Sequence, residues 1–137
     1  MIVIDASVWI SFLVQQDVNH VVTHSWFTKT LLNGDPIAAP VLLLAEIGGA
    51  MARRLQQPEM GQKAIQHLSS IPTLRLISMD HELGIQAAHL AATYQLRGAD
   101  AVYVAVAAQL DIPLVSWDKE QLTRANDIIT AYPPTEA

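Results

Sequence analysis

The sequence predicts an α/β fold, in which helices cover both faces of a mostly parallel central sheet and form a three-layer α/β/α sandwich. Three observations predict it. Short apolar runs typical of buried strands alternate along the chain with longer helical patterns. Strands alternating with helices are typical of parallel sheets. Neither a repeat nor an internal linker divides the 137 residues, so one domain is expected over residues 1–132, with residues 133–137 as a C-terminal tail.

Two strands and four helices are predicted in the first half of the chain. The run "MIVID" is short, apolar and rich in β-branched residues, whereas "VLLLAEIGGAMARRLQ" has the length and composition of a helix. The predicted elements are a strand over 1–5, a helix over 7–14, a helix from the cap Asn19 to about Leu32, a strand over 37–40, a helix over 41–56 with Pro40 in its first turn, and a helix from Pro58 to about Ser69.

The second half continues the alternation but contains one ambiguous segment. The Val and Tyr residues of "DAVYVAVAAQL" suit a strand, but its length and Ala content favour a buried helix, which we predict with Asp100 at its N-terminus. The other predicted elements are a strand over 74–79, a helix from the cap Asp80 that Gly98 ends, a strand over 112–117, a helix over 118–125 and a last strand over 128–132.

Composition excludes several classes of protein. There is no cysteine, which excludes disulfides and thiolate chemistry. The formal net charge of −5 counts against a general nucleic-acid binder and fits a protein whose carboxylates gather a metal ion. The N-terminus has no basic leader, and no apolar run is long enough to span a bilayer, so a soluble cytoplasmic protein without membrane contact is expected.

Four acids lie in or beside apolar segments: Asp5, Glu46, Asp100 and Asp118. Ligands of open parallel sheets bind at the carboxyl ends of the strands, where we expect these side chains to converge. Carboxylates gathered there would repel one another, and Mg²⁺ or Mn²⁺, which prefers oxygen ligands, would relieve the repulsion. Each acid also has an ordinary explanation: the three aspartates can be helix caps, and Glu46 can be neutral or paired with Arg53 or Arg54.

The segments "VIDASVWI", "APVLLLAEI", "GADAVYVAVAAQLDIPLVSWDKEQL" and "IITA" together resemble a PIN domain, and more narrowly the VapC-type ribonuclease toxins of prokaryotic toxin–antitoxin pairs. The similarity covers essentially the whole chain in the family's order. The C-terminal segment is the most specific part, because an aspartate opens an Ala/Val-rich helix that "IPLVSWD" follows. The resemblance implies a PIN-like three-layer sandwich.

The family's metal ligands can be carried onto this chain. The resemblance implies that Asp5, Glu46 and Asp100 hold Mg²⁺ or Mn²⁺ and that Asp118 completes the site. Ser7 and Ser116 match hydroxyl positions that would orient the carboxylates or waters. The chain departs from the family pattern at Gly48 and Gly49, which weaken the helix after Glu46 and imply either close packing or an irregular turn there.

The activity implied by the resemblance is metal-dependent endoribonuclease cleavage, in which a metal-activated water hydrolyses an RNA phosphodiester bond and leaves 5′-phosphate and 3′-hydroxyl ends. The implied partners are an RNA substrate and a cognate VapB-type antitoxin, and a homodimer is also expected. Two alternatives stay open: a non-catalytic PIN module that only binds a partner, and a receiver-like or dehalogenase-like phosphotransfer domain. The phosphotransfer alternative fits less well, because Asp5 begins the sequence "DAS" and not the D-x-D pattern of the phosphatases.

Overall fold

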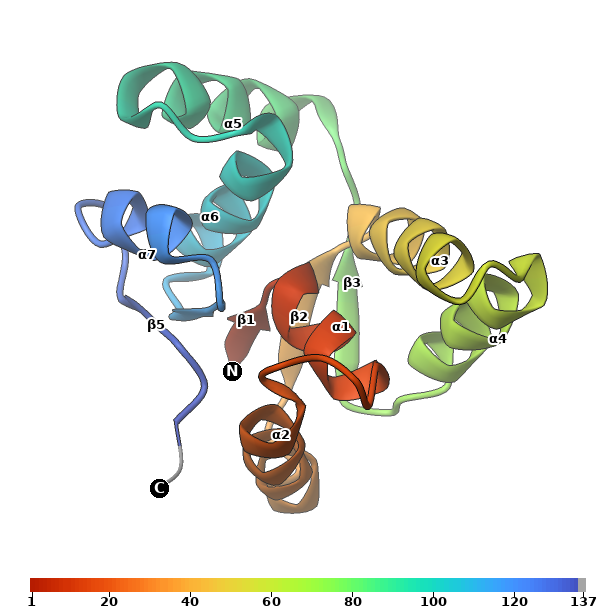
Figure 1. Ribbon diagram of the computed structural model, residues 1–137. Coiled ribbons are helices and arrows are strands. Elements are labelled where there is room, and N and C mark those ends of the chain that lie inside the picture. Colours follow the sequence, from red (N-terminus) through yellow and green to blue (C-terminus); the bar gives the residue numbers. More distant parts are fainter. Residues whose placement is uncertain (136–137) are drawn as a thin grey trace.

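The computed structural model describes residues 1–135, which form one five-stranded sheet and seven helices (Figure 1). The sheet has the order β3-β2-β1-β4-β5, and every neighbouring pair is parallel. The predicted α/β fold is therefore confirmed. Along the chain the elements are β1 (Ile2–Ile4), α1 (Ala6–Leu13), α2 (His20–Asn33), β2 (Ile37–Pro40), α3 (Leu42–Leu55), α4 (Pro58–Ser69), β3 (Leu74–Ile77), α5 (His81–Tyr94), α6 (Gly98–Leu110), β4 (Leu114–Val115), α7 (Lys119–Ala125) and β5 (Ala131–Tyr132).

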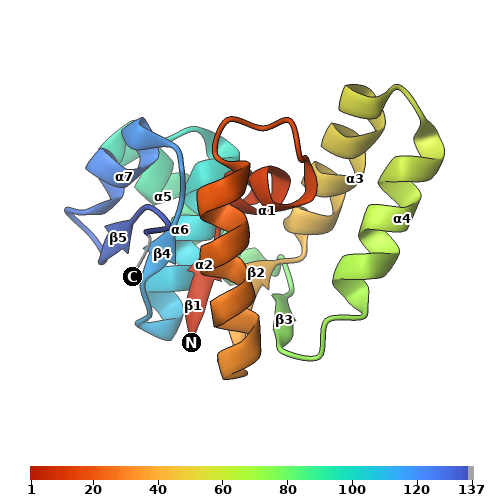
Figure 2. The same ribbon diagram turned by 60° about the horizontal axis from the view of Figure 1, so that its bottom comes forward.

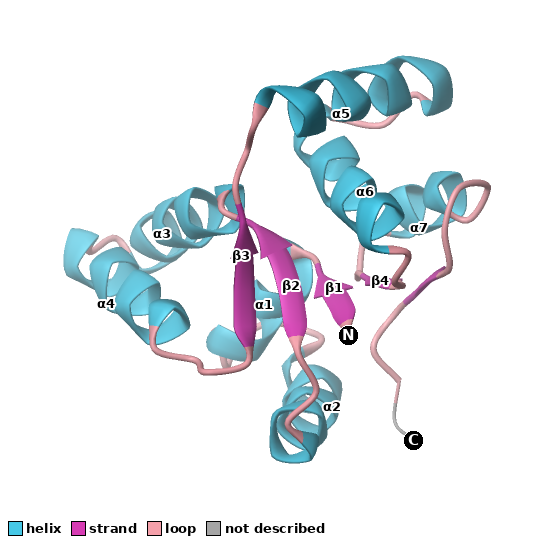
Figure 3. Ribbon diagram, turned by 180° about the vertical axis from the view of Figure 1, so that it is seen from behind, coloured by secondary structure: helices cyan, strands magenta, loops and turns pink. Residues whose placement is uncertain are grey.

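Strand β1 lies at the centre of the sheet, where the strand order reverses. The chain builds β2 and β3 on one side of β1 and then β4 and β5 on the other. Figure 2 shows α1 and α2 on the near side of the sheet and α6 on the far side, which gives three layers. Figure 3 shows that β1 and β2 end at the same edge. The carboxyl end of β1, which leads into Asp5, is thus the position where sheets of this kind bind ligands.

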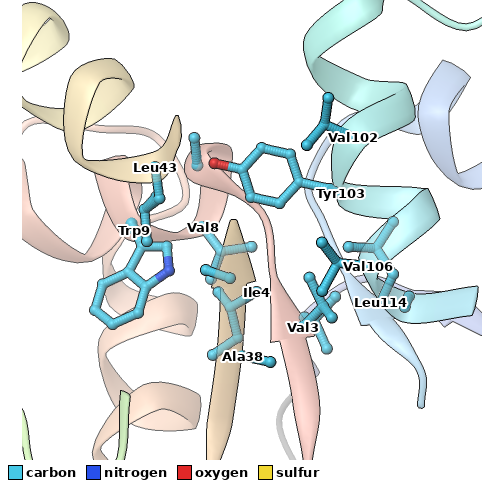
Figure 4. Packing of buried hydrophobic residues seen from close by; sticks show 14 of the residues in the cluster. Val3, Ile4, Val8, Trp9, Ala38, Leu43, Val102, Tyr103, Val106 and Leu114 are labelled. Carbon is cyan, nitrogen blue, oxygen red and sulfur yellow. The ribbon is translucent and has the colours of Figure 1, made fainter. Parts of the chain in front are cut away.

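Helix α6 forms the centre of the core on its side of the sheet. Seven consecutive residues, 101–107, are buried, and α6 packs against β1, β2 and β4. A helix with apolar residues on every side has to be enclosed on every side. Figure 4 shows Val106 of α6 beside Val3 and Leu114 of the sheet, while the Tyr103 ring extends from α6 toward the side of Leu43. The helical prediction for this segment is confirmed.

Several predicted boundaries are wrong, among them the last strand, which was expected over 128–132 and covers only Ala131–Tyr132. The strand predicted over 37–40 is confirmed as β2, but Pro40 is not in the first turn of the next helix; it lies beyond the last pair with β1, so its missing N–H is tolerated there. Gly98 does not end α5 but begins α6, because Gln95 already takes the left-handed conformation that ends α5. The strand predicted over 112–117 shortens to β4, since the Ile112 N–H closes the end of α6 by donating to Ala107 O at 3.0 Å.

The described part of the predicted tail carries no secondary structure. Within it Pro134 is buried, and residues 136–137 lie outside the described residues. None of the helices within residues 1–135 is both long and apolar enough to cross a membrane.

Two glycines bring α3 and α4 into close contact. Helix α3 runs without interruption past Gly48 and Gly49. A Cβ atom added at Gly61 of α4 would overlap the carbonyl oxygen of Gly48 and lie 3.2 Å from the Cβ of Ala52. Of the two alternatives that the sequence left open here, close packing is therefore the one observed. It fixes α3, which carries Glu46, against α4.

We expect Gly61→Ala to destabilise the protein by about 1–3 kcal/mol, because the added methyl forces backbone apart at a packed contact. Gly84→Ala is the matched control: Gly84 lies in α5 with no other atom within 4 Å of an added Cβ. That substitution should stabilise the helix by about 0.5–1 kcal/mol. Urea unfolding of both variants measures the difference, and equal effects would contradict the packing role of Gly61.

Candidate active site

The four predicted acids line one cavity of about 330 Å³. It opens where β1 ends and is bordered by the N-terminal ends of α1, α6 and α7 and by the middle of α3. The structure thus brings together residues that are up to 113 positions apart in sequence, since β1 and β4 are adjacent in the sheet. The residues lining the cavity include Asp5, Ser7, Glu46, Arg97, Asp100 and Asp118.

Asp5 is both a helix cap and a buried acid of the cavity. Its Oδ2 accepts hydrogen bonds from the Ser7 backbone N–H and from Ser116 Oγ, each at 3.1 Å. Burial nevertheless raises the pKa of this carboxyl above its ordinary value, and the hydrogen bonds only partly oppose the shift. The cap explanation is therefore correct but does not compete with a site role, because the same side chain ends the central strand.

Ser116 joins three of the elements around the cavity. Its hydroxyl is fully buried and lies 2.8 Å from Gln121 Oε1, in addition to its contact with Asp5. It also accepts a hydrogen bond from the Asp118 backbone N–H at 3.0 Å. Ser7 Oγ accepts from the Trp117 backbone N–H at 3.0 Å. Both predicted hydroxyls therefore hold the loop that carries Asp118 beside Asp5.

Gln121 is a buried polar residue that the sequence reasoning missed. Its side chain is 1% exposed and reaches from Ser116 toward the Asp100 carbonyl, 3.4 Å away. Its backbone N–H donates to Asp118 Oδ1 at 3.1 Å. The available signal was the spacing "DKEQ", which resembles a capping box with Asp118 as the cap. The pattern locates the helix start but not the inward direction of the glutamine.

Glu46 is held by a hydroxyl from the opposite side of the sheet. Tyr103 Oη donates a hydrogen bond to Glu46 Oε1 at 2.7 Å. Burial, aided by the neighbouring Glu46 carboxylate, raises the Tyr103 pKa, so the phenol stays a donor. Arg54, a partner considered for Glu46, instead lies 3.5 Å from Asp17. Tyr103 was predicted only as part of a buried helix, because a tyrosine in an apolar run gives no sign of its hydroxyl's partner.

Asp100 and Asp118 share one cation, the guanidinium of Arg97. Its Nε donates to Asp100 Oδ2 at 3.1 Å, and its Nη2 donates to Asp118 Oδ2 in a short contact. Asp118 is the N-cap of α7, as one explanation predicted, whereas Asp100 lies in the first turn of α6 and is not its cap. Arg97 is therefore more than a solvated surface residue, because the structure pairs it with two of the acids.

The electrostatics of the cavity favour a cation. Burial raises the pKa of both Glu46 and Asp100, and the repulsion between these carboxylates and Asp5 raises both pKa values further. The donors are all carboxylate oxygens, which Mg²⁺ and Mn²⁺ prefer, so the set fits such an ion in charge and in ligand type. Within residues 1–135, however, no three acidic or histidine side chains are spaced to share one ion as they stand, while Arg97 holds two of the acids.

In metal-free buffer at neutral pH we expect Asp100→Asn to melt about 1–3 °C above the wild type. The Asp100 pKa is raised from 3.8, so the folded state disfavours the ionised carboxyl and loses stability as pH rises through the folded pKa. The gain should therefore vanish below the ordinary aspartate pKa, where both side chains are neutral. Thermal melts from acid to neutral pH measure it, and a variant less stable at neutral pH would contradict net repulsion at this position.

The chain belongs to the PIN domain family, since a sequence model of the PIN domain matches residues 2–127. This match favours the PIN resemblance over the phosphotransfer alternative. A search of curated proteins found no match.

Solved structures of toxins and toxin–antitoxin complexes share the fold. VapC20 from Mycobacterium tuberculosis, a toxin that cleaves the sarcin–ricin loop, is 19% identical, with a TM-score of 0.74 over 90% of this chain and 94% of that one. A toxin–antitoxin complex from Klebsiella pneumoniae is 17% identical, with a TM-score of 0.67 over 100% of both chains. VapBC2 from Rickettsia felis, bound to a DNA fragment from its promoter, is 14% identical, with a TM-score of 0.71 over 96% of this chain and 98% of that one.

Proposed function

We propose that the protein is a metal-dependent endoribonuclease and the toxin of a toxin–antitoxin pair. The observation that carries the proposal is the convergence of Asp5, Glu46, Asp100 and Asp118 on one cavity at the carboxyl edge of a PIN-domain sheet. The raised pKa values of three of these acids support the proposal, because perturbed acids in a cavity are typical of functional sites.

Each acid has a role that follows from its surroundings. Asp5, Glu46 and Asp100 would hold Mg²⁺ or Mn²⁺, and Asp118 would complete the site. When bound, such an ion stabilises charge on phosphate oxygens and makes water a better nucleophile at neutral pH. Ser116 and Gln121 fix the carboxylates of Asp5 and Asp118 through hydrogen bonds, so that little rearrangement is needed when a substrate arrives.

Tyr103 gives Glu46 a fixed direction. The hydrogen bond at 2.7 Å directs one carboxylate oxygen to the phenol and leaves the other for a ligand in the cavity. Such outer partners orient metal ligands and strengthen their binding. Glu46 needs this partner more than the aspartates do, because it lies inside α3 and not at a helix N-terminus.

The substrate and the partner follow from the related structures. VapC20 is a toxin that cleaves the sarcin–ricin loop, and the complexes from Klebsiella pneumoniae and Rickettsia felis pair toxin with antitoxin. These likenesses support RNA as the substrate class and an antitoxin as the partner. The net charge of −5 suits a partner whose contacting segment is basic.

Incubation with total RNA and Mn²⁺ or Mg²⁺ should produce discrete fragments, and EDTA should abolish them. Asp5→Asn should reduce cleavage by roughly a hundredfold or more, since loss even of outer partners of metal ligands costs about 10- to 100-fold. Asp80→Asn is the matched control, because Asp80 caps α5 away from the cavity and asparagine caps equally well. Gel analysis and mapping of the fragment ends measure the outcome.

Three results would contradict the proposal. One is cleavage that persists in EDTA, and another is cleavage that Asp5→Asn leaves unchanged in a folded protein. The third is an intact RNA pool, containing both transfer and ribosomal RNA, after incubation with a preparation that binds Mn²⁺. That third result would favour the non-catalytic binding module.

A further inference from the structure

Arg97 is the one basic residue among those lining the acid cavity. Its guanidinium bridges Asp100 on α6 and Asp118 at the start of α7. Arginine matches carboxylates with a rigid fork of N–H donors, so one side chain can satisfy two acids at once. These two ion pairs of Arg97 therefore connect α6 and α7, two helices whose N-termini face the cavity.

The chain holds Arg97 in this position from both sides. Leu96, the residue before it, is buried, and its backbone N–H donates to Ala91 O at the end of α5. Arg97 itself is the N-cap of α6 with an extended backbone, and Asp100 follows three residues later in the first turn. The backbone is thus fixed, while the side chain is 72% exposed and can leave the acids without disturbing the core.

We propose that Arg97 is an internal counter-ion of the acid cavity, which a divalent cation displaces when it binds. The inference rests on the proposed function, because it assumes that Asp100 and Asp118 are metal ligands. The guanidinium and a metal ion would compete for the same two carboxylates, because Arg97 contacts Asp100 Oδ2 and Asp118 Oδ2 and two cations held this close together repel each other. Without metal, Arg97 reduces the repulsion that the buried acids would otherwise suffer.

The spacing of the acids fits this competition. With Arg97 in place, no three acidic side chains of the described chain are close enough to share an ion. Metal binding therefore requires the acidic side chains to move closer together, and on this proposal Asp100 and Asp118 exchange Arg97 for the metal ion as they do so. A charge of +2 replaces a charge of +1, so the exchange is favourable but weaker than binding to unpaired acids. The affinity for metal is consequently set in part by how strongly Arg97 is held.

Isothermal titration of the metal-free protein with Mn²⁺ tests the proposal. Arg97→Gln should lower the Kd for Mn²⁺ by about three- to tenfold, as expected from the loss of two exposed ion pairs that compete with the metal. Arg97→Lys keeps the charge but loses the fork of N–H donors, so its Kd should lie between those of the wild type and Arg97→Gln. In EDTA, Arg97→Gln should melt below the wild type, and added Mn²⁺ should remove that difference.

Arg124→Gln is the matched control. Arg124 lies close to Arg97 in the structure but pairs with Glu120 at 2.8 Å and not with the four acids. The Arg124→Gln substitution removes the same charge from the same region without freeing a proposed ligand. The Kd of this variant for Mn²⁺ should therefore stay near that of the wild type. Equal tightening by both variants would show a general charge effect and would overturn the counter-ion role, as would an unchanged Kd for Arg97→Gln.

The outcomes separate this inference from the proposed function. Failure of every variant to bind Mn²⁺ would overturn the metal site itself and the inference with it. Binding of Mn²⁺ by the wild type with no effect of Arg97→Gln would overturn only the counter-ion.

Discussion

The structure depends on one electrostatic constraint: several carboxylates are held close together at the buried end of the central strand. Asp5 follows β1 at the point where the strand order of the sheet reverses, and parallel strands bring the neighbouring acids to the same edge. Burial there penalises the charged form of Asp5, Glu46 and Asp100. The polar contacts around the cavity are the means by which the fold tolerates that charge.

Helix N-termini provide much of this tolerance. Asp5 and Asp118 are N-caps of α1 and α7, and Asp100 lies in the first turn of α6. The partial positive charge of a helix N-terminus favours a carboxylate by about 0.3–1 kcal/mol. Capping and ligand binding are therefore compatible uses of one side chain. Glu46 lies within a helix and lacks the support of a helix N-terminus. The hydrogen bond from the Tyr103 hydroxyl stabilises its carboxylate instead.

The helical frame around the cavity is fixed by packing of two different kinds. Helix α6 is buried over residues 101–107, so Asp100 and Tyr103 share a rigid support. Helix α3 depends on the approach of Gly61 to Gly48, where any larger side chain would push the helices apart. These two helices place the acids on opposite walls of the cavity with little freedom to spread. The repulsion between the acids must then be met by cations and donors, of which Arg97 is the one with a full charge.

The sequence by itself determined the alternation of elements, the parallel sheet and the identity of the four acids, because apolar runs and capping residues act over a few neighbouring positions. It also placed the α6 helix correctly from length and alanine content. Only the tertiary structure decided that Gly98 begins a helix and does not end one, since a glycine suits either position locally. It alone decided the partners of the acids. Tyr103 meets Glu46 across 57 positions and Arg97 meets Asp118 across 21, and such pairs form only when the whole sheet assembles.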